Sequence, residues 1–304
     1  MSEMTAKARA DVFTGYHPIV NLVYFSLVIG YSMFFTHPVC LCISLLCALS
    51  SSLYINGRKA ARFTLVYMLP MMIFTALLNP IFNHQGMTVI TYLPGGNPLT
   101  LESILYGLAA AATLVAVISW FSCFNAVVTS DKLVYLFGRL VPALSLILAM
   151  SLRLAPRYSE RLEIIANARK HALGSEEDGR FLKKIKRAVK TRSVMITWAL
   201  ENAIETADSM KARGYGLSGR TAFSIYRFDN RDKKALLYIV VCAAYIAAGA
   251  LSGAYRFRYF PSIKGEWGGL FTVSVFVAYL ALCGFLLIIN VMDDILWKSI
   301  ESKI

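Results

Sequence analysis

The chain has 304 residues, of which 57% are hydrophobic and only 16% are charged, and its mean hydropathy is +0.56. Soluble domains contain about 45–50% apolar and about 25% charged residues, so this composition excludes an ordinary soluble protein. Its 31 Lys and Arg outnumber 18 Asp and Glu, and the resulting net charge of +13 is typical of a membrane-surface protein or of a membrane protein with a positive cytoplasmic side.

Six apolar stretches are long enough to be transmembrane helices, since a hydrocarbon layer about 30 Å thick requires about 20 helical residues. They contain no Lys, Arg or Asp, and their one Glu, Glu102, lies at the start of the fourth. The stretches are 18–36, 39–55, 63–82, 101–128, 235–255 and 268–292. The second is the shortest, so we expect it to cross with little tilt or to insert only in part.

The links between the stretches predict the topology. Link 56–62 carries three basic residues and is expected in the cytoplasm, whereas link 83–100 has no formal charge and is expected outside. Both termini should then be cytoplasmic, in a bacterial or archaeal plasma membrane. Link 256–266 is an exception, because it is expected outside and yet carries three basic residues and one acidic residue.

A charged segment separates the fourth and fifth stretches. Residues 129–234 contain 21 Lys or Arg and 11 Asp or Glu, and so carry +10 of the total +13. A connection of this length is expected to be a domain. The predicted organisation is therefore an N-terminal transmembrane region (1–128), a cytoplasmic helical domain (129–234) and a C-terminal transmembrane region (235–304), in an all-α membrane protein.

The cytoplasmic domain has the periodicity of helices. We expect them at 131–140, 142–155, 157–171 and 180–213. Pro156 is expected to interrupt the helical pattern, and glycines should end the last two helices, at Gly174 and at Gly214.

The two long amphipathic helices end alike, on Ala168-Arg169-Lys170 and on Ala212-Arg213-Gly214. The helix dipole explains one cation in a last turn. Two such ends in one basic domain indicate docking surfaces, because the small alanine permits close approach and the guanidinium can bind a partner's carboxylate through two hydrogen bonds.

These motifs resemble the transmembrane T component (EcfT/CbiQ family) of energy-coupling factor (ECF) transporters, which belong to the ABC type. The resemblance is carried by 210–216 (MKARGYG), 219–221 and 226–229, by 151–156 (SLRLAP), and by the pair His17-Pro18. It implies a coupling subunit of an importer for a vitamin or related micronutrient. Two ABC-type ATPase subunits would bind ATP and Mg, and a separate membrane S component would bind the substrate.

In that family, two arginines at the ends of coupling helices dock into the ATPases, which implies this role for Arg169 and Arg213. Lys170 departs from the family pattern, which has a small residue there. Gly107 and Ala111, in the small-residue stretch 107–112, are weaker candidates for contact with the S component, the alternative being packing within this subunit.

No cofactor, metal or nucleic-acid site is expected in this chain. It lacks a Walker A loop, and its GxGxxG pattern at 214–219 follows a long helix where dinucleotide binding requires a strand. The basic run at 183–187 lacks interleaved aromatics, so anionic lipid or an acidic protein surface is the expected partner. Alternatives to the coupling subunit are a self-sufficient secondary transporter, disfavoured by the lack of ionisable groups at membrane depth, and a membrane enzyme, for which no nucleophile–base pair is found.

Overall fold

The computed structural model describes residues 12–92, 97–172, 181–215, 226–265 and 269–301, and the chain divides into two compact units. Unit 1 combines the two ends of the chain, 1–129 and 226–304, and unit 2 comprises 130–225.

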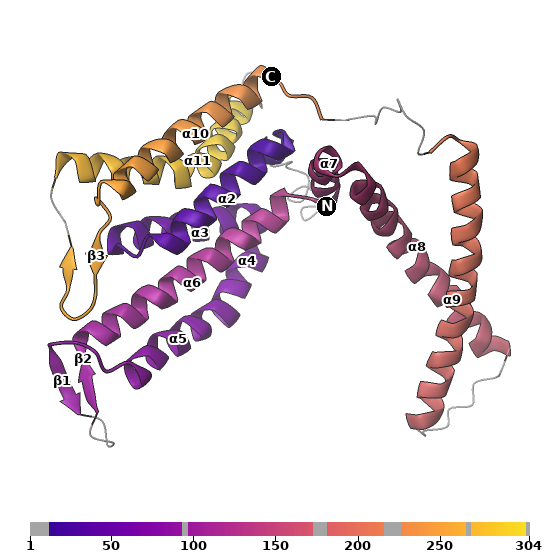
Figure 1. Ribbon diagram of the computed structural model, residues 1–304, viewed down its shortest axis with the longest axis horizontal. Coiled ribbons are helices and arrows are strands. Elements are labelled where there is room, and N and C mark those ends of the chain that lie inside the picture. The colour runs from indigo at the N-terminus through magenta and orange to yellow at the C-terminus, as the bar shows by residue number, and fades with distance from the viewer. Residues whose placement is uncertain (1–11, 93–96, 173–180, 216–225, 266–268, 302–304) are drawn as a thin grey trace. The chain divides into compact units, whose positions relative to one another are not determined.

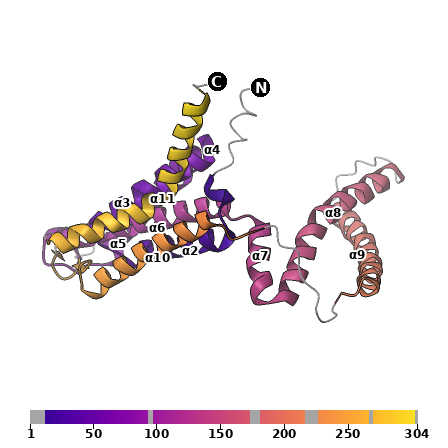
Figure 2. The same ribbon diagram turned by 90° about the horizontal axis from the view of Figure 1, so that it is seen from above.

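Unit 1 is a bundle of long apolar helices (Figures 1 and 2). Their bounds are α2 Pro18–Phe34, α3 Pro38–Asn56, α4 Arg58–Phe63, α5 Leu69–Phe82, α6 Leu101–Val127, α10 Asn230–Leu251 and α11 Leu270–Glu301. A 3₁₀ turn, η1 (Val12–Gly15), precedes α2, and a π-helical turn, η2 (Thr64–Met68), joins α4 to α5.

Each of the six predicted stretches forms a helix. Five of the described helices are long and apolar enough to cross a membrane, with α4, η2 and α5 counted together as one of 25 residues. The helix of the first stretch, α2, is shorter, at 17 residues, whereas α3 has 19. The helix of the second stretch begins one residue earlier and ends one residue later than the apolar run, and it is long and apolar enough to cross a membrane.

Two histidine–proline pairs begin neighbouring helices. His17 and His37 are the N-caps of α2 and α3, and in each case Nδ1 accepts the backbone N–H two residues on, at 3.3 Å. The proline that follows occupies the first helical position, where a backbone N–H would have no partner within the helix, so its absence costs no hydrogen bond. These pairs fix where both helices start.

Helix α6 lies at the centre of unit 1 and packs on α2, α3 and α5. Its Trp120 is fully buried, and the indole Nε1 donates to Ser44 Oγ at 3.1 Å. Ser44 also bonds Ser32, at 2.6 Å, and Ser32 bonds the Tyr279 hydroxyl, at 3.3 Å. Because these polar groups form hydrogen bonds with one another in an apolar core, they fix the positions of α2, α3, α6 and α11 relative to one another.

Two short hairpins lie together at one end of the bundle (Figure 1). Strand β1 (Val89–Tyr92) pairs with β2 (Pro98–Thr100), and β3 (Phe257–Arg258) pairs with β4 (Lys264–Gly265), both antiparallel. The Met87 N–H donates to the Pro261 carbonyl at 3.1 Å, which joins the two connections. No strand was predicted in either link.

Unit 2 consists of α7 (Ser130–Leu140), α8 (Pro142–Ala172) and α9 (Phe181–Ala212). The predicted break at Pro156 is wrong, because α8 continues through this residue. Proline removes one internal hydrogen bond, but α7 and α9 pack along α8, and tertiary packing of this kind stabilises a helix more than local propensity does. The expected helix end at Gly174 lies outside the described residues.

Candidate partner-docking sites at two helix ends

Helices α8 and α9 cross near their middles (Figure 1). Tyr158 of α8 packs edge-on against Trp198 of α9, with ring centroids 5.8 Å apart. The Arg161 guanidinium lies 5.2 Å from the centroid of the same indole, a cation–π contact that adds to this edge-on aromatic contact. Each helix therefore extends as an arm on both sides of this contact.

The C-terminus of α9 is closed by a Schellman motif. The Tyr215 N–H donates to the Met210 carbonyl at 3.1 Å, and the Gly214 N–H donates to the Lys211 carbonyl at 3.0 Å. Gly214 has φ +73°, a left-handed conformation that costs other residues about 1–2 kcal/mol. The glycine of the Ala-Arg-Gly motif thus ends the helix immediately after Arg213, as predicted.

Arg213 is exposed at this helix end, and so is Ala212 before it. In this turn Lys211 forms an ion pair with Asp208, at 3.8 Å. Arg213 forms no ion pair with any of the described residues. An exposed guanidinium beside an alanine at a rigid helix end can reach a carboxylate on a partner without breaking an internal contact.

The first motif lies in the last turn of α8. Ala168 is exposed, but the side chains of Arg169 and Lys170, like those of the basic residues in the run 183–187, lie outside the described residues. At 1.5 Å per residue, Arg169 is about 16 Å along its axis from Tyr158, and Arg213 is about 22 Å from Trp198. Because the motifs end different helices of a crossed pair, they occupy separate arms.

An apolar ridge on α9 was not singled out as a functional surface in the sequence. Val189, Ile196, Leu200 and Ile204 are 59–65% exposed, whereas the neighbouring Met195 is 7% exposed. Their spacing places them on one face of the helix. The signal was present in the sequence, but a periodic stripe does not itself distinguish a face packed within the domain from one left for a partner.

Gly107 and Ala111, the weaker candidates for contact with an S component, are buried in unit 1. A Cβ on Gly107 would lie 2.7 Å from the Ala76 carbonyl oxygen of α5, so the glycine permits α5 and α6 to approach closely. Both residues are therefore packed within this subunit, which was the alternative to contact with an S component. Contact of Gly107 with another protein would require α5 to move.

A further group of residues, not anticipated from the sequence, joins the start of α10 to the start of α2. The Asp232 carboxylate is buried and accepts the backbone N–H groups of His17 and Asp229, both at 3.1 Å. The Arg231 guanidinium lies 4.3 Å from the centroid of the Tyr16 ring. Burial raises the pKa of Tyr16, and Arg231 opposes that shift. We call this group, Tyr16, His17, Asp229, Arg231 and Asp232, the α2–α10 clasp.

Comparison with known proteins connects these features to a family. The family model described as cobalt transport protein, CbiQ, matches residues 16–223, more than two thirds of the chain. The match therefore includes both arginine motifs and most of the transmembrane region before them.

Two curated relatives share a shorter segment of 102 residues. Both are energy-coupling factor transporter transmembrane proteins EcfT, from Lactobacillus helveticus (26% identical) and Lactococcus lactis subsp. cremoris (30% identical). Each alignment covers 33% of this chain, and 37% or 38% of the relative. The resemblance inferred from the motifs is thereby confirmed, and the chain belongs to the CbiQ family of transmembrane transport proteins, as a T component of the energy-coupling factor type.

Proposed function

We propose that this chain is the coupling subunit of an ECF-type importer, which transmits the closure of two ABC-type ATPases to an S component that binds a vitamin or related micronutrient. The observation that carries the proposal is the crossed pair α8–α9, whose two arginine motifs end separate arms. ATP and Mg would bind to the ATPases, and this chain would hydrolyse nothing.

Each helix end would hold one ATPase. At α9, the Schellman motif ends the helix at Arg213, and the exposed Ala212 allows a groove on the partner to close around it. Arg169 would have the same role at the end of α8. Two ends on separate arms fit a pair of identical or similar subunits, each of which binds one arginine through a carboxylate.

Movement of the ATPases would pivot the crossed helices about the contact between Tyr158 and Trp198. The apolar ridge of α9 supports a role for this pair in binding the S component, because four large apolar side chains are left exposed along one face. An S component is itself apolar, and its docking on the ridge would couple the pivot to its own reorientation.

In the sequence, the clasp residues of α10 follow the segment that connects α9 to unit 1. Asp232 ties the start of α10 to the backbone at the start of α2, so a pull on the segment after α9 would act on two transmembrane helices together. The bundle end with the clasp also carries the basic link before α4, which supports a cytoplasmic position for this end and for both termini.

The proposal is tested by substrate uptake in cells that express the whole transporter. Replacing both arginines (Arg169→Ala with Arg213→Ala) should abolish uptake and weaken association with the ATPases. The matched control is Lys211→Ala, which removes a cation from the same last turn of α9 and should retain uptake. Full uptake by the double variant would overturn the docking mechanism, and transport by the purified chain alone in liposomes would favour the secondary-transporter alternative.

A further inference from the structure

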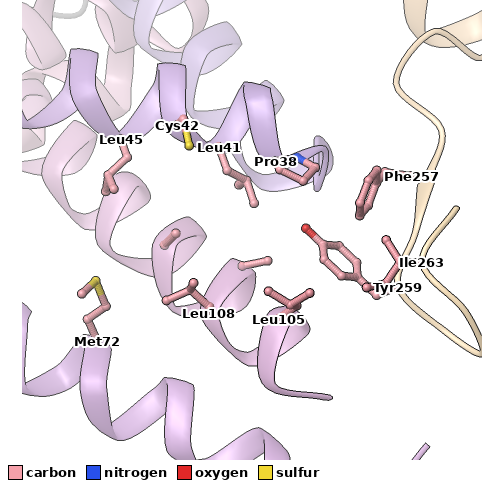
Figure 3. Close-up of a pocket in the computed structure, with 12 residues that line it drawn as sticks. Pro38, Leu41, Cys42, Leu45, Met72, Leu105, Leu108, Phe257, Tyr259 and Ile263 are labelled. Atoms are coloured by element: carbon pink, nitrogen blue, oxygen red, sulfur yellow. The ribbon is translucent and has the colours of Figure 1, made fainter. Parts of the chain in front are cut away.

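Unit 1 contains an apolar cavity of about 510 Å³ beside the β3–β4 hairpin (Figure 3). Helices α3, α5 and α6 form its walls, and side chains of the hairpin point into it from the opposite side. Residues from the hairpin are Phe257, Tyr259 and Ile263, and those from the helices include Leu41 of α3 and Leu108 of α6.

The lining of the cavity selects an apolar occupant. Its side chains are aliphatic, aromatic or sulfur-containing, and the Tyr259 hydroxyl already donates to the Thr36 carbonyl at 2.9 Å. Water would find almost no polar partner here, and a water molecule needs two to four of them to occupy a cavity stably.

The position of the cavity indicates where such an occupant comes from. The lining residues of α3 and α6 lie in the first turns of these helices, Pro38 to Leu45 and Leu105 to Ala112, within about 17 Å of the helix ends beside the hairpins. This depth corresponds to one leaflet of a bilayer about 30 Å thick. An acyl chain of that leaflet is an apolar group that lies at this depth.

The hairpin beside the cavity is amphipathic. Because side chains alternate along a strand, Phe257 and Arg258 lie on opposite faces, and Arg258 is paired in register with Lys264. Both basic residues are exposed, and no described acidic side chain forms an ion pair with either of them. Like charges directly opposite each other destabilise a strand pair, and a bound anion relieves that repulsion.

We propose that this end of unit 1 binds an anionic phospholipid, with one acyl chain in the cavity and the phosphate on Arg258 and Lys264. The same hairpin supplies the apolar wall on one face and the two cations on the other, so it would lie in the interface between the hydrocarbon and the headgroups. The site explains two of the three basic residues that link 256–266 carries at the bundle end where the other long link, 83–100, carries no formal charge.

The test is native mass spectrometry of the full chain in detergent, titrated with phosphatidylglycerol or with phosphatidylcholine. The wild-type chain should retain one phosphatidylglycerol at least tenfold more tightly than phosphatidylcholine. The double variant Arg258→Gln with Lys264→Gln should lose this preference, and Leu108→Trp, which fills the cavity, should weaken the binding of both lipids. The matched controls are Lys298→Gln, an exposed cation near the end of α11, and Phe121→Trp, an exposed aromatic farther along α6; both should bind like wild type.

Each result bears on one part of the site. Equal affinity for the two lipids, or an unchanged preference in the Arg258/Lys264 double variant, would overturn the assignment of the phosphate. Unchanged binding by Leu108→Trp would overturn the assignment of the acyl chain, and so would displacement of the lipid by inorganic phosphate alone. Circular dichroism of every variant should match wild type, which would show that the variants fold. The proposal would be refuted if the purified chain carried a copurified protein at the cavity instead of a lipid.

Discussion

The left-handed glycine at the end of α9 offers a test of docking that leaves Arg213 itself in place. Gly214→Ala places a Cβ on a residue with φ +73°, at a cost of about 1–2 kcal/mol. The helix end would relieve this strain by giving up the two Schellman hydrogen bonds, to the carbonyls of Met210 and Lys211. Arg213 would then be presented on a frayed end.

The expected loss of affinity follows from the strain. If docking requires the closed helix end, a cost of about 1–2 kcal/mol corresponds to about 5- to 30-fold weaker binding of the ATPase subunit at this end. Gly214→Asn should lose less, because asparagine adopts the left-handed conformation more readily than alanine. Binding would be measured by titrating purified ATPase subunits onto the chain in detergent or nanodiscs.

A second glycine supplies the matched control. Gly57, after α3, has φ +56° and open space around the position of a Cβ, so Gly57→Ala introduces backbone strain in unit 1 without a steric clash. It should leave ATPase binding unchanged. The reasoning is refuted if Gly214→Ala binds as tightly as wild type, or if Gly57→Ala weakens binding as much, since binding would then follow the overall stability of the chain.

Three further predictions concern the bundle, the clasp and the ridge. Gly107→Ala should lower the free energy of unfolding by about 1–3 kcal/mol, because its Cβ overlaps a carbonyl of α5. Thermal melting in detergent would measure this loss. The control Gly30→Ala, which has open space around the position of its Cβ, should melt no lower than wild type. Asp232→Ala, which removes the acceptor of two backbone N–H groups, should reduce uptake while ATPase binding persists, and equal loss of both would contradict a role in transmission. Leu200→Glu and Ile204→Glu should each reduce the amount of S component that copurifies, without loss of ATPases; unchanged recovery would show that the ridge has another role.

Much of unit 1 could be predicted from the sequence, because a membrane helix requires an uninterrupted apolar run. All six helices lie where those runs are. The His17-Pro18 and His37-Pro38 pairs could also have located two helix starts, since a capping side chain followed by proline is a local signal.

Features that depend on tertiary contacts were harder to predict from the sequence. The β3–β4 hairpin has only two residues in each strand, too few for an alternating pattern, and its cavity exists only because segments far apart in the chain meet there. The break expected at Pro156 is wrong because the local rule omits the packing of α7 and α9 on α8. No pattern in the sequence shows which backbone N–H groups donate to the Asp232 carboxylate.

The two docking ends were proposed from residue type and position at a helix terminus. The structure adds the Schellman geometry at Gly214, the exposure of Arg213 and the crossing at Trp198, all of which are local to unit 2. Which protein surface receives each arginine depends on the partner, and so lies beyond any property of this chain alone.

The most direct test of the central claim is the subunit composition of the purified transporter, measured by native mass spectrometry. The wild-type complex should contain two ATPase subunits for each copy of this chain. Arg213→Glu and Arg169→Glu should each lose one ATPase and the double variant should lose both, while the charge-matched control Lys211→Glu retains two. A double variant that still carries two ATPases, or a control that loses them equally, would contradict docking through these two arginines.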